Sequence, residues 1–173
     1  MRILGYMAAS VDGYIADRDG GISWLDPFND VDAGYDGFIA GIGTVVMGRR
    51  TYDQVRTYGT YPYPAQRSIV VTHGPIDAAP PGVEAWHDGV PALIAHLRQA
   101  EADRNAWVVG GAALQAAFIA AGGLDSLELF VIPVLLGDGV RMFPPLPPSG
   151  PLRLDGAKML GKGMIRLAYG LRP

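Results

Sequence analysis

Two short segments of this chain combine residue types that bind phosphate groups. In 44–51 and in 106–114, an apolar run typical of a buried strand ends at glycine, and a helix-forming stretch follows at once. A helix N-terminus presents unpaired N–H groups and the positive end of the helix dipole, and glycine lets an anion approach the backbone closely. Two such junctions in one chain predict a site with room for a diphosphate or an extra phosphate.

The first junction also carries positive charge. Arg49 and Arg50 follow Gly48 directly, and Thr51 adds a backbone N–H and a hydroxyl. An arginine at a helix start is unfavourable with the helix dipole, which argues for a bound anion over the alternative of a merely solvated side chain. Arginine also suits the 2′-phosphate that distinguishes NADPH from NADH.

Two further sets of residues complete the predicted cofactor site. Thr72 and His73 follow the next strand and are expected to border the 2′-phosphate, although His73 is equally consistent with an ordinary loop residue. At the second junction, Gly110 and Gly111 are the diphosphate candidates, and a tight strand-to-helix turn is their alternative reading. Three residues next to this glycine pair are also expected to bind the cofactor: Val109, Ala112 and Leu114.

The elements that must position these residues follow a clear order. Strands are predicted at 2–9, 44–47, 68–72, 83–86, 107–109 and 127–136, helices at about 31–40, 49–55, 88–97 and 113–121, and a final hairpin at 152–171. Alternating strands and helices indicate an α/β fold with a mostly parallel sheet, helices on both faces and antiparallel strands at one edge. Because adjacent parallel strands end at one edge, both glycine junctions are expected to form one cradle.

Composition restricts the possible partners. The 173 residues are 49% hydrophobic and 18% charged with a formal net charge of −3, which fits a single globular domain over 1–173. No basic stripe is visible, so no nucleic-acid partner is expected. Cysteine is absent and the three histidines lack ligand spacing, so no metal site is expected. Without a long apolar run or a secretory signal pattern, we expect a cytoplasmic protein without membrane association.

Three motifs in order resemble a known superfamily. Val45–Tyr52 resembles the MGRxTxE-type stretch of the dihydrofolate reductase fold. Ser10–Ala16 resembles the SLDGxIA segment, and Leu127–Gly139 the L-x-L-x-x-x-P-x-x-L-G-x-G strand, of the RibD C-terminal reductase domain of riboflavin-biosynthesis enzymes. The resemblance implies a dihydrofolate reductase-like fold, NADPH as the cofactor, hydride transfer to a pteridine- or pyrimidine-like ring, and a homodimer built on the C-terminal strands.

The same resemblance suggests substrate and catalytic residues. The aspartate of the riboflavin-reductase segment helps hold the substrate, which makes Asp12 a catalytic candidate, although aspartate is also a common turn former. The spacing of Asp32 to Gly48 matches that of the acidic residue that binds the pterin amidine in dihydrofolate reductase, so Asp32 is the second candidate. Its alternative is a carboxylate that stabilises a helix start. Asp36, one turn later, is a weaker candidate for substrate binding.

The remaining candidates are apolar residues that could surround a planar ring. Ala9 and Ile15 are expected beside the nicotinamide, and Ala8, Trp24 and Phe28 beside the substrate, the last two within a long flap. Each could equally be a core residue. The sequence thus predicts an NADPH-dependent reductase of a heterocyclic small molecule. The competing interpretation is an NADP(H)-binding protein without reductase activity on folate or riboflavin precursors.

Overall fold

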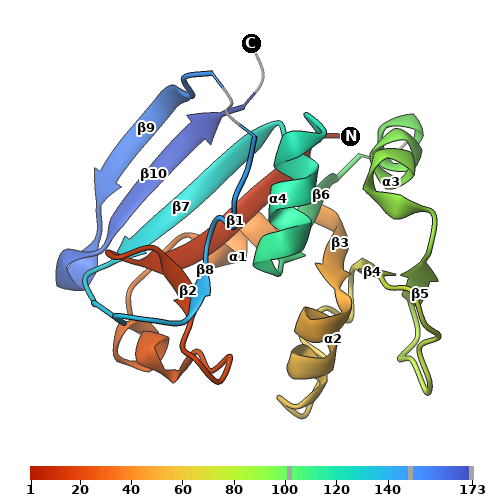
Figure 1. Ribbon diagram of the computed structural model, residues 1–173, viewed down its shortest axis with the longest axis horizontal. Coiled ribbons are helices and arrows are strands. Elements are labelled where there is room, and N and C mark those ends of the chain that lie inside the picture. The colour runs from red at the N-terminus through yellow and green to blue at the C-terminus, as the bar shows by residue number, and fades with distance from the viewer. Residues whose placement is uncertain (101–102, 148–149, 172–173) are drawn as a thin grey trace.

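Runs of apolar and β-branched residues form a central sheet of eight strands (Figure 1). The computed structural model describes residues 1–100, 103–147 and 150–171. The strand order is β5-β4-β3-β6-β1-β7-β10-β9. The bounds are β1 Ile3–Ser10, β3 Ile42–Gly48, β4 Arg67–Val71, β5 Val83–Trp86, β6 Asn105–Gly110, β7 Ser126–Ile132, β9 Arg153–Met159 and β10 Ile165–Gly170. All pairings from β5 to β7 are parallel, and β10 pairs antiparallel with both β7 and β9.

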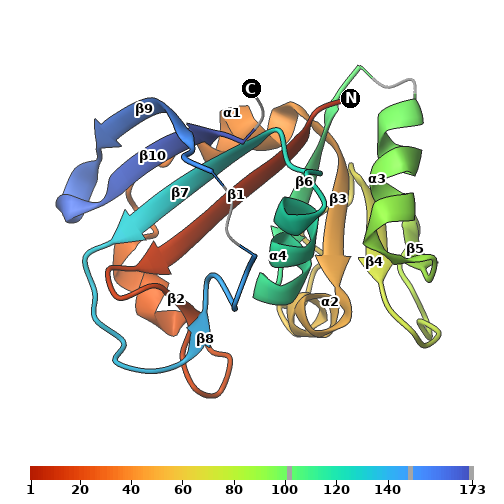
Figure 2. The ribbon, with the colours of Figure 1, turned by 45° about the horizontal axis from the view of Figure 1, so that its top comes forward.

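Helices cover both faces of this sheet (Figure 2). α3, Gly89–Gln99, and α4, Ala112–Ala120, pack on one face through a core that includes Leu97 and Phe118. α1, Tyr35–Ala40, and α2, Arg49–Arg56, pack on the other face, where Phe38 and Tyr52 contribute to a second core cluster. The predicted α/β architecture with a C-terminal antiparallel hairpin is therefore confirmed. None of the helices in the described ranges is long and apolar enough to cross a membrane.

The strand predicted at 127–136 is shorter than expected. β7 ends at Ile132 because the next residue, Pro133, has no N–H to continue the ladder. The chain then runs along the turn that follows β1, where β8, Val140–Arg141, pairs with β2, Tyr14–Ala16, in a small second sheet that the sequence did not indicate. This pairing fixes the segment after β7 against the turn that follows β1.

The predicted flap and first helix also differ from the structure. The flap contains a 3₁₀ helix, η1, Ser23–Phe28, and the helix predicted from about residue 31 begins only at Tyr35. Gly34 has a φ of +75°, which ends any helix approaching from the N-terminal side. A second short 3₁₀ turn, η2, Gly161–Gly163, joins β9 to β10. Residues 29–34 therefore form an irregular connection on the same side of the sheet as α1.

Candidate functional site

The two glycine junctions lie side by side at the carboxyl edge of the sheet. β3 and β6 are neighbours, and Met47 pairs with Gly110. A Cβ atom built on Gly48 would lie 3.9 Å from the carbonyl oxygen of Gly110 and 3.9 Å from the nitrogen of Gly111. One built on Gly111 would lie 3.3 Å from Oγ1 of Thr51. The starts of α2 and α4 thus meet at one place, which we call the glycine cradle, formed by Gly48, Thr51, Gly110 and Gly111.

The cradle has the properties of a diphosphate site. Gly48 and Gly111 are the N-cap residues of α2 and α4, and neither helix start has a hydrogen bond from a capping side chain. Gly110 has a φ of +134°, a conformation open to glycine and strained for other residues. The backbone N–H groups at both helix starts therefore face a surface without side-chain obstruction. These residues fit the phosphates of a dinucleotide.

The arginines next to the cradle have different surroundings. Arg49 donates from Nε to Asp53 at 2.9 Å and from Nη1 to the carbonyl oxygen of Pro75 at 2.8 Å. These bonds hold it against the loop after β4, where Thr72 is buried and His73 is exposed. Arg50 is exposed, and within the described ranges it has no ion-pair partner. The structure thus brings Arg49 to the loop of Thr72 and His73 and leaves Arg50 open to solvent.

Several other predicted cofactor residues use their side chains for the core. Leu114 packs with the α3–α4 cluster, and Val109 packs on the opposite face. Ala9 is buried beside Met7, with Ile15 packed against the same cluster. Ala112 is also buried. Any contact between the buried Leu114, Ala9 or Ala112 and a cofactor would therefore come from the backbone.

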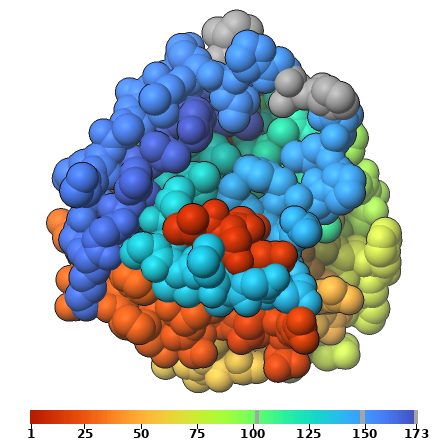
Figure 3. Space-filling view, turned by 60° about the vertical axis from the view of Figure 1, so that its left-hand side comes forward, coloured from red at the N-terminus to blue at the C-terminus, as the bar shows by residue number. Residues whose placement is uncertain are grey.

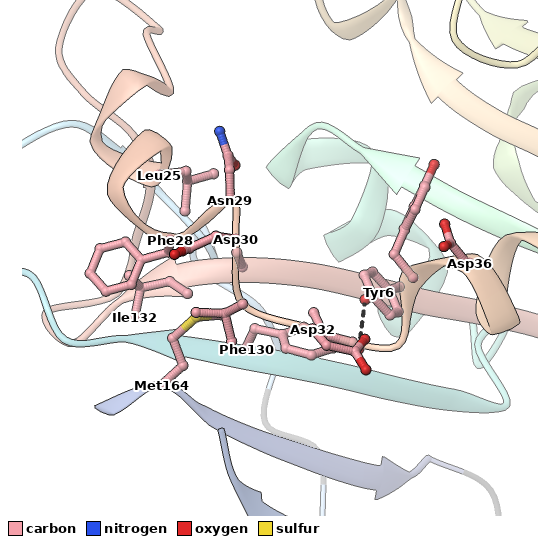
Figure 4. Close-up of a pocket in the computed structure, with 14 residues that line it drawn as sticks. Tyr6, Leu25, Phe28, Asn29, Asp30, Asp32, Asp36, Phe130, Ile132 and Met164 are labelled. Atoms are coloured by element: carbon pink, nitrogen blue, oxygen red, sulfur yellow. Dashed lines mark hydrogen bonds between the residues drawn. The ribbon is translucent and has the colours of Figure 1, made fainter. Parts of the chain in front are cut away.

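A cavity of about 720 Å³ opens on the α1 face of the sheet (Figure 4). Its apolar wall comes from β1, β7, η1, the connection to α1 and the residue before β10: Ala8, Leu25, Phe28, Val31, Ala33, Phe130, Ile132 and Met164. Its polar lining comes from Tyr6 of β1, from the connection to α1 and from α1 itself: Tyr6, Asn29, Asp30, Asp32, Tyr35 and Asp36. We call this cavity the α1 pocket. Ala8, Phe28, Asp32 and Asp36, all predicted from the sequence, line it.

Tyr6 is the polar group on the floor of the α1 pocket. Its ring stacks on Phe38 at 4.3 Å and contacts Phe130 at 4.6 Å between ring centroids. Its hydroxyl donates to the carbonyl oxygen of Ala33 at 3.2 Å, the bond drawn in Figure 4. Burial raises the pKa of Tyr6 to about 12, and the carboxylate of Glu128 adds to the shift. The phenol is therefore neutral at physiological pH and held in one orientation.

Three carboxylates surround the mouth of the α1 pocket. Asp32 accepts a hydrogen bond at 2.8 Å from the backbone N–H of Gly34, so it lies in the turn before α1 and not at the helix start. Asp36 is exposed in the first turn of α1. Asp30 is 2.5 Å from Nζ of Lys162, a residue of η2 that also donates to the carbonyl oxygen of Pro27 at 2.6 Å. Lys162 thus connects the β9–β10 turn to the flap.

The glycine cradle and the α1 pocket are linked by one strand. β1 lies between β6, which ends in the cradle, and β7, which supplies Phe130 and Ile132 to the pocket. Ala8 of β1 lines the pocket and pairs in register with Phe130. The arrangement can hold a phosphate-bearing molecule on one side of β1 and a planar apolar one on the other.

Comparison with known proteins agrees with this geometry. The family model of the RibD C-terminal domain matches residues 3–166 of this chain. The chain belongs to the RibD C-terminal domain family. It is 37% identical over 166 residues to the uncharacterized protein YwjB of Bacillus subtilis (strain 168), covering 95% of this chain and 94% of that protein.

Solved structures show that this RibD C-terminal domain has a dihydrofolate reductase-like fold. A putative riboflavin biosynthesis protein from Shewanella sp. PV-4 superposes with a TM-score of 0.86 at 26% identity, with 98% of each chain covered. Dihydrofolate reductase from Enterococcus faecalis, complexed with NADP(H), gives 0.73 at 22% identity, covering 98% of this chain and 95% of that one. A Thermotoga maritima deaminase/5-amino-6-(5-phosphoribosylamino)uracil reductase gives 0.75 at 17% identity, with 98% and 56% covered.

Asp12 of this RibD C-terminal domain lies away from the α1 pocket. Its carboxylate accepts hydrogen bonds from Oγ of Ser10 at 2.6 Å and from the backbone N–H groups of Leu136 and Gly137 at 3.1 and 2.7 Å. The Ser10 hydroxyl and these N–H groups lower the pKa of Asp12. Figure 3 shows the turn after β1, in red, enclosed by the cyan segment that follows β7. The carboxylate is therefore committed to joining two loops.

The structure also shows pocket residues that the sequence did not indicate. Tyr6, Phe130 and Met164 line the α1 pocket, and Lys162 fixes its flap. The alternation along β1, which places Tyr6 and Ala8 on one face, was the available signal for Tyr6. Trp24, predicted to line the substrate cavity, is not among the residues that line the α1 pocket. It packs against the cluster of Phe130, Ile132 and Met164, which do line it.

Proposed function

We propose that this chain is an NADPH-dependent reductase that transfers hydride to a C=N or C=O group of a pteridine- or pyrimidine-like heterocycle. The observation that carries the proposal is the pairing of the glycine cradle with the α1 pocket across β1. Family membership adds support, because solved neighbours include a dihydrofolate reductase complexed with NADP(H) and a protein named as a reductase.

In this proposal each part of the protein has a defined task. Backbone N–H groups at the starts of α2 and α4 hold the diphosphate, and Arg49 and Arg50 bind the 2′-phosphate from the rim. NADPH supplies the hydride when bound. The backbone of Ala8 and Ala9 lies where cofactor and substrate would meet, because β1 separates the glycine cradle from the α1 pocket. The protein contributes orientation and a partly dry cavity.

Residues that line the α1 pocket would deliver the proton that the reaction needs. Asp32 has a carboxylate at the pocket mouth that can accept hydrogen bonds from ring N–H groups and pass a proton through water. Tyr6, neutral and fixed by Ala33, offers a hydroxyl that can accept a hydrogen bond from the ring. Asp12, whose oxygens bond to Ser10 and to two backbone N–H groups, is proposed as a positioning residue.

A cofactor titration followed by a substrate screen tests this function. We expect NADPH to bind more tightly than NADH in a fluorescence titration, and a pterin, an aminopyrimidine or a dicarbonyl compound to accelerate loss of absorbance at 340 nm. If NADPH and NADH bind equally, the cofactor proposal fails. If NADPH binds tightly and no compound of these classes accelerates its oxidation, the chain is an NADP(H)-binding protein without this reductase activity.

We also propose a homodimer built on the C-terminal strands. Every residue of β9 is exposed at the edge of the sheet, including Leu154 at 55% and Met159 at 80% of full exposure. An unpaired edge strand with exposed apolar side chains is a template for pairing with a second copy. Light scattering of the purified protein, with a mass near twice 18.4 kDa expected, tests this assembly.

A further inference from the structure

The charges around the α1 pocket are unevenly compensated. Of the described residues that line it, three are aspartates and none is a lysine, arginine or histidine. Asp30 is neutralised by Lys162 at 2.5 Å. Asp32 and Asp36 have no ion-pair partner within the described ranges, and both are exposed at the mouth. Two negative charges are therefore available to a ligand that enters the pocket.

The other nearby cation is also already paired. Arg166 of β10 is opposite Phe130 in the β7–β10 register, so its side chain is on the pocket face of the sheet. Its Nε lies 2.7 Å from Oε2 of Glu128, a residue opposite Tyr6 in the β1–β7 register. The Glu128 carboxylate therefore offsets the positive charge that Arg166 would offer to a ligand phosphate. The sheet beneath the pocket thus adds no net positive charge.

We propose that the α1 pocket selects a neutral or cationic nitrogen-rich ring and rejects phosphorylated or carboxylated forms of the same ring, with Asp32 and Asp36 as the specificity-determining residues. The proposal rests on the proposed function for the assignment of this pocket to the substrate. Exposed carboxylates attract ring N–H groups and amidinium-like edges and repel anionic substituents. The name of the Thermotoga maritima relative refers to a phosphoribosylamino-uracil, so the two proteins would differ in substrate class.

The position of Tyr6 is consistent with this selectivity. The Asp32 and Glu128 carboxylates both raise the pKa of Tyr6, in addition to burial, which is the largest cause. The Arg166 guanidinium lowers the same pKa and so opposes these carboxylates. Burial at the pocket floor would penalise an anionic ligand group as it penalises the Tyr6 phenolate.

The expected selectivity follows from Coulomb's law at an exposed site. A carboxylate about 6 Å from a ligand anion in water weakens binding about threefold, so two carboxylates weaken it about tenfold. Salt reduces the effect, because the Debye length at 0.5 M is shorter than this separation. Selectivity should thus be largest at low ionic strength.

A matched pair of pterins tests the proposal. We would measure binding of 6-hydroxymethylpterin and pterin-6-carboxylate from the anisotropy of their own fluorescence, without NADPH, at pH 7.5 and low salt. The first should bind about tenfold more tightly than the second. The ratio should fall to about threefold in Asp36→Asn and toward one in the double variant with Asp32→Asn, and 0.5 M salt should reduce it in the unmodified protein.

A control variant and the order of the assays keep the outcomes distinct. Asp88→Asn removes a carboxylate at the N-cap position of α3 and should leave the ratio unchanged. Equal or tighter binding of the carboxylate, a ratio unaffected by Asp36→Asn, or no binding of either pterin overturns the proposed selectivity. Because NADPH is absent from this assay, a failure of cofactor binding or turnover counts against the proposed function alone.

Discussion

Replacing Gly111 by alanine should separate cofactor binding from folding. Gly111 has a φ of −76°, which alanine adopts without strain. The new methyl group would meet Oγ1 of Thr51 at 3.3 Å, a contact that a rotation of the threonine side chain relieves. We therefore expect a folding cost below about 1 kcal/mol and a Tm change of no more than about 4 °C.

The effect on NADPH should be much larger. The methyl group would stand at the start of α4, where phosphate oxygens must approach the backbone. Loss of a hydrogen bond to a charged group costs about 1.5–3 kcal/mol, which corresponds to about ten- to a hundredfold weaker binding. Titration of NADPH by its fluorescence gives the dissociation constant, and a thermal melt of the same sample gives Tm.

Gly156→Ala provides the matched control. Gly156 lies in β9, remote from the cradle, and an added Cβ would have no neighbour within 4 Å. It should change neither Tm nor NADPH affinity appreciably. If the Gly111→Ala protein has an unchanged Tm and its dissociation constant for NADPH is within twofold of that of the unmodified protein, the assignment of the cradle as a diphosphate site is refuted.

Three further expectations concern the rim, the β1 turn and the hairpin. Arg50→Ala should weaken NADPH binding about tenfold and leave NADH binding unchanged, since only NADPH has the 2′-phosphate, and equal losses for both cofactors would contradict this. Asp12→Asn should lower Tm at pH 7 and retain most of kcat. Hydrogen bonds depress the pKa of Asp12 in the folded protein below 3.8, so the stabilisation by this carboxylate is present above pH 3.8 and is lost as pH falls through the pKa of the folded state. In melts from pH 6 to 2, the Tm of the Asn variant should therefore fall less than that of the unmodified protein. Leu154→Lys should convert the proposed dimer to a monomer of 18.4 kDa in light scattering, and an unchanged mass would place the interface elsewhere.

The residues that the sequence located well are those with a local signal. Gly48 and Gly111 are each preceded by an apolar strand and followed by a helix, and adjacent parallel strands had to bring their ends together. Asp32 was found by its spacing along the chain. The sequence did not predict that Asp32 lies in a turn. The left-handed conformation of Gly34 delays the start of α1, and tertiary packing decides whether a glycine there adopts a turn or a helix.

The residues that the sequence missed depend on register and on distant segments. Alternation puts Tyr6 on the same face of β1 as Ala8, but β1 is apolar on both faces, so its composition does not show which face lines a pocket. Met7, on the other face, packs with Ile15 and Met142. Met164 reaches the α1 pocket only because β10 pairs with β7. The end of β7 at Ile132 was missed because Pro133 lay within an otherwise uninterrupted apolar run.

The contact of Lys162 with the flap has a consequence for the order in which the two halves of the site are completed during synthesis. Every residue of the glycine cradle precedes α4, which ends at Ala120, whereas the α1 pocket needs Lys162 and Met164 from the last hairpin. A chain emerging from the ribosome therefore contains all of its cradle residues some fifty residues before its pocket can close. The residues of the proposed nucleotide site are thus complete early in the chain, and the proposed substrate pocket needs the hairpin of β9 and β10.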